Sequence, residues 1–401
     1  MLQHLRFTTA GESHGKGTLA IVEGVPAGLP LSPEDIARDL ARRQLGYGRG
    51  GRMAIEKDAG EVLAGVRLGE TLGSPIAVWI RNRDHVNWET AMSIEAQPEA
   101  DDDALRRVYL PRPGHADLVG MLKYDRADAR DILERSSARE TSARVAAGAV
   151  ARRLLAELGV SVGSHVTRIG SVQAAAPEEF PNDLNAAADS SELRCLDPES
   201  EERMRQAIDA AREAGDTLGG EFEIVGIGLP VGLGSHVSWD RRLDGRLAGA
   251  LMSIQAMKGV QIGLGFEASR RRGSDVHDEI VTGAGRDRTA GFRRTGNHAG
   301  GLEGGMTTGE PLVARVAMKP LSSLTRPLAS VDVRTGQPAE AVRERSDVCA
   351  VPAAAVVGEA MFALVLGDAM LEKFGGDSLA ETRANLEAYL GRAGERARRW
   401  E

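Results

Sequence analysis

The most apolar stretch of the chain, residues 351–371, constrains the fold more than any other feature of the sequence. It is long enough to cross a membrane, but it carries two acidic residues, Glu359 and Asp368. Segments that cross a membrane have few or no charged residues. We therefore expect a long helix that is buried in the core. Apolar residues make up 42% of the 401-residue chain, which is enough to surround such a helix.

The charge of the chain argues against a nucleic acid as partner. The chain has 50 Lys and Arg against 58 Asp and Glu, a formal net charge of -8, whereas nonspecific nucleic-acid binding needs a basic face. Most of the positive charges are arginines that cluster, and the planar guanidinium suits phosphate and carboxylate groups. The composition therefore predicts a globular protein with a focused anion-binding pocket.

The cysteines and the N-terminus indicate where such a protein works. Cys195 and Cys349 lie far apart and have no metal-ligand spacing, so we expect neither a disulfide framework nor a metal site. The N-terminus lacks a basic segment followed by a long apolar one, the pattern of a signal peptide. We expect a cytoplasmic protein that does not bind to a membrane.

Strand-like and helix-like segments are mixed along the chain. A helix start is clearest at Ser32, an N-cap residue that is followed by Pro33 and two acidic residues. The mixture is compatible with the α+β class but does not by itself fix the architecture. The predicted strands are residues 19–23, 61–66, 76–80, 164–172, 217–229 and 313–318, and the predicted helices are residues 32–45, 128–158, 198–214, 241–257, 351–371 and 379–390.

Two short sequences resemble each other weakly, which is consistent with two similar halves. Residues 26–29, Pro-Ala-Gly-Leu, weakly resemble residues 230–233, Pro-Val-Gly-Leu, and a predicted helix follows each. The identity is too low to prove a repeat from the sequence. No proline-rich or serine-rich linker divides the chain, so we expect residues 1–401 to form one domain.

A histidine in a glycine-flanked turn is the first candidate functional residue. In residues 11–15, Gly-Glu-Ser-His-Gly, the two glycines allow backbone conformations that other residues avoid. Such a turn can hold the imidazole of His14 against a ligand. The alternative is an ordinary polar turn residue, and the motifs that follow favour the functional interpretation.

Residues 46–52, Gly-Tyr-Gly-Arg-Gly-Gly-Arg, have the glycine spacing of a dinucleotide-binding fingerprint. That fingerprint requires a strand before it and a helix after it. Here a predicted helix comes before it, and residues 53–56 are strand-like. We therefore predict a basic loop in which Arg43, Arg49 and Arg52 close over an anion. The alternative is a solvated loop with scattered charge.

Further motifs combine a rigid or open backbone with charged groups. Two prolines in residues 111–117 fix the backbone just before His115, which favours a functional histidine over a surface one.

Residues 135–137, Arg-Ser-Ser, suit a phosphate, although alternating charges on a helix usually mark a solvated face. Residues 297–305 form a glycine-dense loop whose N–H groups can approach a ligand. Asp347 precedes the predicted buried helix, and a carboxylate is stabilised near the N-terminus of a helix.

Together these motifs resemble those of the chorismate synthases, and the resemblance covers nearly the whole chain. No single motif is specific, but the set is highly specific. The motifs that carry the resemblance are residues 11–15, 46–52, 112–115, 134–140, 300–305, 319–323 and 345–348.

The resemblance implies a lyase of the shikimate pathway for aromatic amino acids. Such an enzyme removes phosphate and a ring hydrogen from 5-enolpyruvylshikimate 3-phosphate by 1,4-elimination and so forms chorismate. The family requires reduced FMN without net redox change, and NADPH is an implied reductant. The substrate carries a phosphate and two carboxylates, which would explain the clustered arginines because guanidinium groups attract such a trianion strongly in a partly dehydrated site.

The resemblance also implies a role for each site residue. His14 protonates the leaving phosphate, a task that suits histidine because its pKa lies near working pH. His115 sets the protonation of the reduced flavin near N1, and Asp347 accepts the proton relayed through flavin N5. The residues implied to bind the flavin are Arg135, Ser136, Ser137, Gln255, Ala256, Gly304, Lys319, Pro320, Leu321, Ser322, Ser323 and Arg345. Those implied to bind the substrate are Ser13, Arg52, Arg112 and Arg139, with Arg43 and Arg49 assigned to the substrate or to NADPH.

The implied fold is a β-α-β sandwich in which helices pack between antiparallel sheets, and the implied assembly is a homotetramer. Two rival functions stay open. A different flavin enzyme with a phosphorylated substrate, such as a flavin reductase, would oxidise NADPH without releasing phosphate. A noncatalytic anion-binding or RNA-binding protein is disfavoured by the net charge of -8 and by the aromatic content of 4%, since single-strand binders stack bases on aromatic rings.

Overall fold

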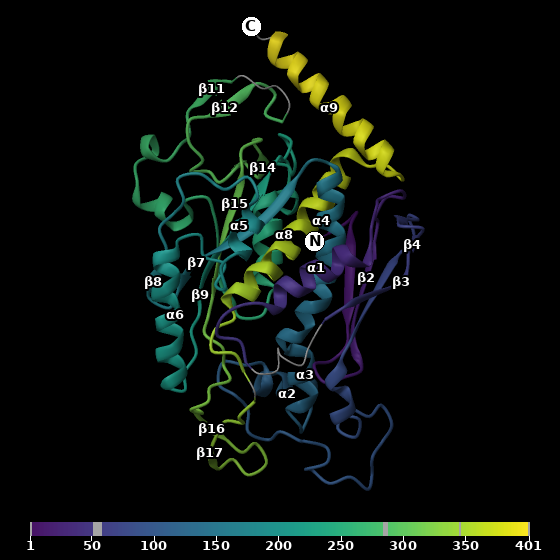
Figure 1. The fold of residues 1–401 in the computed structure, drawn as a ribbon, viewed down its shortest axis with the longest axis vertical. Coiled ribbons are helices and arrows are strands. Elements are labelled where there is room, and N and C mark those ends of the chain that lie inside the picture. Colours follow the sequence, from purple (N-terminus) through teal and green to yellow (C-terminus); the bar gives the residue numbers. More distant parts are fainter. Residues whose placement is uncertain (1, 51–57, 284–287, 345, 400–401) are drawn as a thin grey trace.

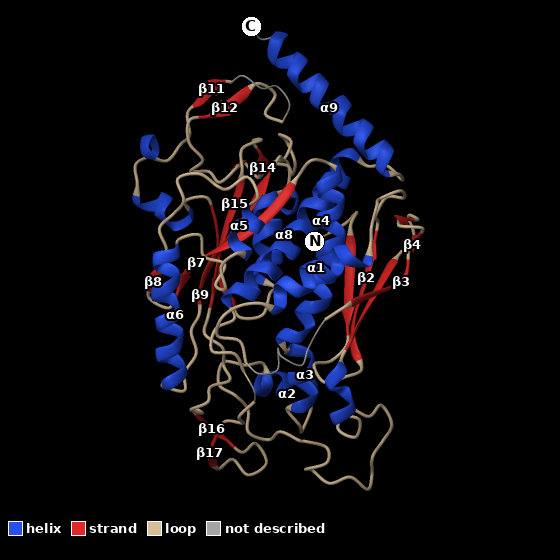
Figure 2. Ribbon diagram, in the orientation of Figure 1, coloured by secondary structure: helices blue, strands red, loops and turns tan. Residues whose placement is uncertain are grey.

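The computed structural model describes residues 2–50, 58–283, 288–344 and 346–399, so the strand-like residues 53–56, Arg52 and Arg345 lie outside the described residues. Its centre is a layer of helices between two antiparallel sheets (Figures 1 and 2). The strands of the first sheet are, in spatial order, β1 (Arg6–Ala10), β2 (Gly17–Glu23), β6 (Ile76–Arg81) and β3 (Gly60–Ala64). Those of the second are β10 (Met257–Ile262), β15 (Leu312–Met318), β9 (Gly220–Ile227), β7 (Ser161–Ile169) and β8 (Val172–Gln173).

The middle layer includes α1 (Pro33–Gln44), α4 (Thr141–Glu157) and α8 (Val351–Phe374). α4 packs against β2, β6 and α8, and α8 packs against β7 and β9. Small side chains allow the two long helices to approach closely, because a Cβ added at Gly148 would lie 2.3 Å from the Cβ of Ala360. The arrangement confirms the α+β sandwich that the family resemblance implied.

α8 is the buried helix predicted from its acidic residues. It is long and apolar enough to cross a membrane, but its apolar window is wholly buried within the described protein. Glu359 on this helix accepts hydrogen bonds from Arg42 at 2.8 and 2.9 Å, from Arg152 at 2.5 Å and from Arg194 at 3.0 Å. Burial alone would raise the pKa of Glu359, but the three guanidinium groups lower it to about 2. The charge of the acidic residue that argued against a membrane span is thus compensated by three arginines, of which Arg42 and Arg194 are buried.

The chain folds as two halves with the same topology. The first half runs β1, β2, α1, β3, β6, α4, and the second runs β7, β9, α7 (Leu243–Met252), β10, β15, α8. In each sheet the four main strands of the half lie in the order first, second, fourth, third. The two-fold similarity predicted from the sequence is therefore confirmed in the topology.

The repeated tetrapeptide makes the same turn in both halves. Thr71 and Thr307 occupy equivalent places, and the hydroxyl of each donates to a proline carbonyl, of Pro26 and Pro230 respectively, at 2.6 Å. Each hydroxyl also accepts the N–H of the leucine three residues after that proline, at 3.0 and 2.8 Å. A second shared sequence, Thr-x-Gly-x-Pro, begins at each threonine. This second motif strengthens the case for a repeat.

Shorter elements surround the sandwich, and the C-terminal helix leads away from it (Figure 1). They are β4 (Val66–Arg67), β5 (Glu70–Thr71), α2 (Asp117–Tyr124), α3 (Arg130–Ser136), α5 (Leu184–Asp189), α6 (Pro198–Glu213), β11 (Ile280–Thr282), β12 (Phe292–Arg294), β13 (Leu302–Glu303), β14 (Met306–Thr307), β16 (Ala329–Val331), β17 (Pro338–Glu340) and α9 (Leu379–Arg399).

Two predicted helices differ from the structure: one is divided into two helices, and the other ends earlier than expected. The residues at both places line the cavity described below. Residues 128–158 contain α3 and α4, which are separated at Ser137, where the backbone is extended and the hydroxyl accepts the N–H of Arg139. α7 ends at Met252 and not at residue 257. The other predicted elements are present with shifted bounds.

Candidate active site

A cavity of about 1060 Å³ lies between the two halves. Equivalent connections of both halves line it: the segments between α1 and β3 and between α7 and β10, and those that lead into α4 and α8. The turn between β1 and β2 adds a further wall. Thr141 and Ala353, in the first turns of α4 and α8, both line the cavity. Helix N-termini carry partial positive charge, so the fold itself favours an anion here.

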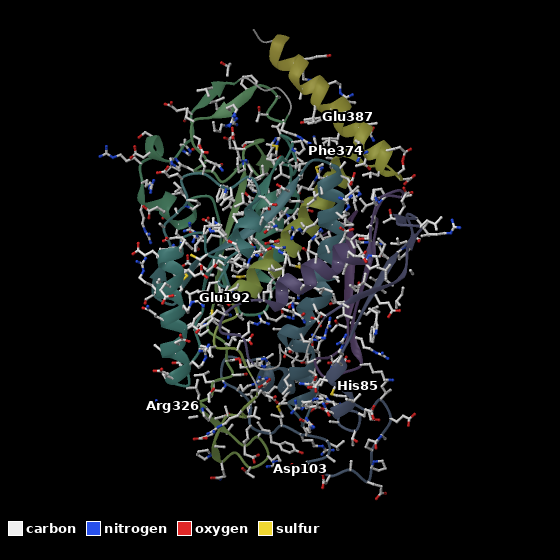
Figure 3. All side chains as sticks on the ribbon, in the orientation of Figure 1. His85, Asp103, Glu192, Arg326, Phe374 and Glu387 are labelled. Carbon is white, nitrogen blue, oxygen red and sulfur yellow. The ribbon has the colours of Figure 1, made fainter. Side chains whose placement is uncertain are left out.

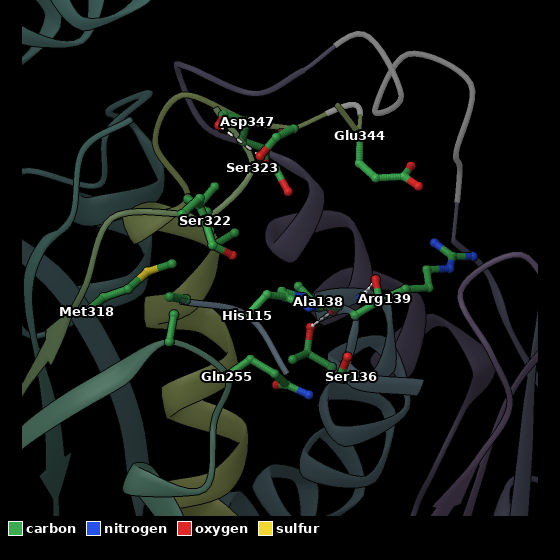
Figure 4. A pocket seen from close by; sticks show the side chains of 18 of the residues that line it. His115, Ser136, Ala138, Arg139, Gln255, Met318, Ser322, Ser323, Glu344 and Asp347 are labelled. Carbon is green, nitrogen blue, oxygen red and sulfur yellow. Dashed lines mark hydrogen bonds between the residues drawn. The ribbon is translucent and has the colours of Figure 1, made fainter. Parts of the chain in front are cut away.

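Most residues predicted for the site lie around this one cavity, although they come from distant parts of the sequence. Figure 4 shows Asp347 and Ser323 on one side of it, and Gln255 and Ser136 on the other. The predicted residues that line it are Ser13, His14, Arg43, Arg49, Arg112, His115, Ser136, Ser137, Arg139, Gln255, Ala256, Lys319, Leu321, Ser322, Ser323 and Asp347.

Three predicted flavin-binding residues are not among the described residues that line the cavity. The guanidinium of Arg135 donates instead to two backbone carbonyl oxygens, in β1 and just after it, at 2.9 and 3.0 Å. Gly304 lies in the turn between β13 and β14. Pro320 lies between two lining residues without being one itself. Arg52 and Arg345, also predicted for the site, are outside the described part of the chain.

His14 is held by a buried carboxylate. Its Nδ1 lies 2.7 Å from Oε1 of Glu134, and its backbone N–H donates to Oε2 at 2.8 Å. Burial would raise the pKa of Glu134, but the hydrogen bonds and charge of His14 and the charge of Arg130 lower it below its ordinary value. An ionised carboxylate can only accept hydrogen bonds, so Nδ1 of His14 carries a proton that it donates to Glu134.

The turn that carries His14 is also held from the end of β6. The side-chain amide of Asn82 donates to the carbonyl oxygens of Ser13 and Gly15 at 3.2 and 2.9 Å. His85, labelled in Figure 3, donates through Nδ1 to the carbonyl oxygen of His14 at 3.0 Å. The backbone of the turn and the ring of the histidine are therefore both fixed, which supports the functional interpretation of His14.

A second carboxylate holds His115 and Arg112 together. Asp117, at the start of α2, is fully buried; its Oδ1 lies 2.5 Å from Nδ1 of His115, and its Oδ2 accepts Nε–H of Arg112 at 2.9 Å. Arg112 also donates to the hydroxyl of Ser323 at 2.8 Å. Burial would raise the pKa of Asp117, but the hydrogen bonds from His115 and Arg112 hold it well below its ordinary value. One ionised carboxylate thus presents a histidine and an arginine to the same cavity.

Two further arginines share a single carboxylate. Nη1 of Arg43 lies 3.2 Å from one oxygen of Asp58, and Nη1 of Arg139 lies 2.7 Å from the other. Arg43 also donates to the hydroxyl of Thr141 at 2.9 Å. Two guanidinium groups of the first half thus lie together beside one carboxylate, near the helix N-termini.

Asp347 belongs to the second half but is held by the first. The N–H of Gly50 donates to its Oδ1 at 2.7 Å, and Nε of Arg49 lies 3.3 Å from its Oδ2. The predicted basic loop therefore contacts an anion, and in this structure that anion is a carboxylate of the chain itself. The contact places Asp347 and Arg49 side by side on the cavity wall.

The second half supplies a polar wall made by the ends of β10 and β15. The N–H of Lys319 donates to the carbonyl oxygen of Ala256 at 2.9 Å, and Ala256 has a φ of 69°, which is uncommon for a residue other than glycine. Gln255 donates to Glu140 at 3.1 Å, whereas its buried Oε1 has no hydrogen-bond partner among the described residues. Burial and the neighbouring Lys258 lower the pKa of Lys319. A buried acceptor and a desolvated ammonium group both suit a polar ligand.

The residues that sequence reasoning missed include Lys258 and Glu344, which line the cavity, and Asp58, Asp117 and Glu134, which hold side chains that line it. Asp117 and Glu134 stand inside motifs that were singled out for their histidine, arginine and serine residues. The acidic residue in each motif was the available signal. It could not reveal the partner, because Glu134 binds a histidine that lies 120 positions away in the sequence.

Comparisons with known proteins agree with this geometry. The model of the chorismate synthase family matches residues 5–371. The chain is 59% identical to a chorismate synthase of Geobacter sulfurreducens over 389 residues, 96% of this chain and 98% of that one. It is 54% identical to a chorismate synthase of Aquifex aeolicus over 398 residues, 97% of this chain and 98% of that one.

A solved structure agrees as well. It is described as a crystal structure of chorismate synthase and matches with a TM-score of 0.79 and 46% identity, over 98% of this chain and 100% of that chain. Chorismate synthases are lyases of the shikimate pathway. The chain belongs to the chorismate synthase family.

Proposed function

We propose that the chain catalyses the reaction of its family in this cavity, the 1,4-elimination of phosphate from 5-enolpyruvylshikimate 3-phosphate with reduced FMN. One observation carries the assignment: His14 and His115, each bound through Nδ1 to a carboxylate, face the same space as Asp347 and a group of arginines. Expelling phosphate requires an acid for the leaving group, a base for the ring hydrogen and cations for the developing charge. The cavity wall supplies all three.

The arginine side of the cavity suits the substrate, which carries a phosphate and two carboxylates. Arg43 and Arg139 lie together beside Asp58, and Asp117 presents Arg112. Ser13 adds a hydroxyl from the same turn as His14. We assign Ser13, Arg112 and Arg139 to the substrate, together with Arg52, and we infer that Arg43 and Arg49 bind either the substrate or NADPH.

The remaining polar residues of the cavity wall fit FMN. The buried Oε1 of Gln255 needs a donor, and a ring N–H of the flavin would supply one. Lys319, Ser322 and Ser323 offer an ammonium group and two hydroxyls that suit its phosphate. Reduced FMN bound here would supply electron density for the elimination and an acceptor for the ring hydrogen. The other residues of the proposed flavin site, which rest on the family resemblance, are Arg135, Ser136, Ser137, Ala256, Gly304, Pro320, Leu321 and Arg345.

Three residues of the chain move or hold protons in this proposal. His14 donates a proton to the leaving phosphate, and Glu134 holds its ring through Nδ1. His115, which is held through Nδ1 by Asp117, would hold a proton for N1 of the reduced flavin when that cofactor is bound. The carboxylate of Asp347 accepts the proton that derives from the substrate ring, while Arg49 keeps that carboxylate at the cavity wall.

The test is an anaerobic assay with dithionite-reduced FMN and 5-enolpyruvylshikimate 3-phosphate that follows phosphate release and chorismate absorbance together. We expect both products one for one without net flavin oxidation. NADPH oxidation without phosphate release would establish the flavin-reductase alternative instead.

Single variants identify which histidines take part. His14→Ala and His115→Ala should each lower kcat by about 10²-fold or more, the usual contribution of an acid–base residue. His165→Ala is the matched control, because His165 is a buried histidine bound to Glu223 at 3.1 Å that does not line the cavity. Full activity in both cavity variants would contradict the acid–base assignment.

We also propose that residues 1–401 act as one catalytic domain within a cytoplasmic homotetramer. An exposed apolar face on α2 supports self-association: Leu118, Val119 and Leu122 are 41%, 70% and 76% exposed. Side chains of this kind, gathered on one short helix, commonly mark a contact between proteins. Size-exclusion chromatography with light scattering measures the assembly, and a mass of one chain would contradict it.

A further inference from the structure

Glu134 makes more hydrogen bonds to the turn that carries His14 than an ordinary ion pair would. Its carboxylate is 3% exposed, and its two oxygens accept separate hydrogen bonds from the ring and from the backbone of the same histidine. The backbone carbonyl of Glu134 also accepts the N–H of Ser13 at 2.9 Å. One residue of α3 therefore determines both the path of the turn and the orientation of the imidazole.

The imidazole is also held on its face. It stacks on Trp88 with ring centroids 3.7 Å apart and an angle of 22° between the planes. The indole is fixed in turn, because its Nε1–H donates to Asp84 at 3.1 Å and the guanidinium of Arg106 lies 4.0 Å from its centroid. Stacking fixes the plane of the imidazole, and the bond to Glu134 fixes its rotation within that plane.

A purely structural role for Glu134 would be to pair with Arg130, whose Nη1 lies 3.3 Å from Oε1. Arg130 has other partners: Nη2 lies 3.2 Å from Glu344, and Nε donates to the carbonyl oxygen of Arg106 at 2.9 Å. Arg130 would keep these two contacts without Glu134, whereas His14 would lose both of its bonds to that carboxylate. The contacts therefore favour a role that is exercised on His14.

We propose that Glu134 is a positioning residue that holds the proton of the neutral His14 ring on Nδ1, so that Nε2 is the atom that delivers the proton. This inference rests on the proposed function. In the step, the Nε2–H bond of the imidazolium breaks, its electron pair stays on the ring, and the proton forms an O–H bond with the leaving phosphate. Glu134 is not among the described residues that line the cavity, so it acts through His14.

The first test is Glu134→Gln, which keeps the shape of the side chain but removes its charge and one acceptor. The amide can no longer accept both N–H groups of His14, and it favours the tautomer with the proton on Nε2. We expect kcat to fall about 10²-fold, within the range for loss of an acid–base catalyst, with little change in KM for the substrate. The pH at which kcat falls on the alkaline side should shift down by about 1–2 units, because the imidazolium loses the negative charge beside it.

Glu134→Asp is the conservative variant, and it also serves if the glutamine variant folds poorly. It retains the negative charge, so the alkaline limb of its kcat–pH profile should lie close to that of the wild type. Its kcat should still be lower, because the shorter side chain holds His14 less well. Glu223→Gln is the matched control, because Glu223 is a buried carboxylate bound to a buried histidine outside the cavity, with its pKa also lowered despite its burial, by His165 and Arg315. It should change stability but leave the pH profile of kcat unchanged.

A double variant decides whether Glu134 acts through His14. In the His14→Ala background, Glu134→Gln should cost little further activity, because the group that it positions is already absent. If the two losses multiply instead, or if the alkaline limb of Glu134→Gln does not move, the proposal is overturned.

The tautomer of His14 separates this proposal from the proposed function. Long-range ¹H–¹⁵N spectra of histidine-labelled protein should show the Nδ1–H tautomer in the wild type and a gain of the Nε2–H tautomer in Glu134→Gln. That result supports the positioning role even if His14→Ala keeps full turnover, which would contradict only the acid role. An unchanged tautomer in the variant would overturn the positioning role.

Discussion

At the scale of single residues, buried carboxylates set how this protein responds to acid. Hydrogen bonds from His115 and Arg112 hold the pKa of Asp117 well below its ordinary value despite its burial. An aspartate titrates near 3.9 in the unfolded chain. Because the folded pKa is the lower one, the stabilisation from Asp117 is complete above the unfolded value and is lost as the pH falls through the folded value.

Asp117→Asn tests this argument. We expect the variant to unfold at lower urea concentration than the wild type at pH 7. We expect the difference in unfolding free energy between the wild type and the variant to be smaller at pH 3. Urea unfolding at both pH values measures it. A gap of the same size at both pH values would mean that the charge of Asp117 is not the source of the stabilisation.

Ala256 makes a second residue-scale prediction, because its φ of 69° is a left-handed conformation that glycine adopts without strain. That conformation costs an alanine about 1–2 kcal/mol, so Ala256→Gly should raise the unfolding free energy by about 0.5–1 kcal/mol once the greater freedom of unfolded glycine is counted. Ala210→Gly, at an exposed position of α6, is the control and should lower it by about 1 kcal/mol. Destabilisation by both variants would show that Ala256 is not strained.

At the scale of elements, the contact between α4 and α8 has no space for an extra methyl group at Gly148. Overpacking of this kind costs typically about 1–3 kcal/mol, so Gly148→Ala should destabilise the protein by about that amount. Gly249→Ala is the same substitution in α7, where a new Cβ would meet nothing within 4 Å; it should stabilise by about 0.5–1 kcal/mol through helix propensity. Opposite signs in urea unfolding are the expected result, and equal effects would contradict the close packing.

The sequence was sufficient to predict some features of these helices but not others. The acidic residues in the apolar stretch were enough to predict that α8 is buried, and a proline after an N-cap serine was enough to place the start of α1. The break at Ser137 was not predictable, because local pattern favours a continuous helix there and the serine side chain caps the turn only once the chain has changed direction. The end of α7 was missed for a similar reason, since the pairing of β10 with β15 determines where the strand begins.

At the scale of the whole molecule, the site is a product of the two-fold arrangement. Each half contributes the segment after its first helix and the segment before its last helix, so Arg49 and Gln255 come from equivalent connections of the two halves. Motif composition was sufficient to choose most of the lining residues. It could not place the guanidinium of Arg135 against β1, because that depends on how α3 approaches the first sheet.

The repeated threonine turn tests the two-fold arrangement itself. Thr71 and Thr307 are 3% and 2% exposed, and each satisfies one buried carbonyl and one buried N–H. Replacing either residue by valine leaves both groups without that partner, which should cost about 1–3 kcal/mol. Because the two turns have the same geometry, the two losses should be similar, and because they share no partner they should add in the double variant.

Urea unfolding of the two single variants and the double variant measures this, with Thr282→Val on the exposed strand β11 as the control that should change stability by no more than about 0.5 kcal/mol. A loss in one half alone would mean that the shared sequence is retained without a shared role. Similar and additive losses would mean that both halves depend on the same turn, so that the fold that converges on the active site is one structural unit used twice.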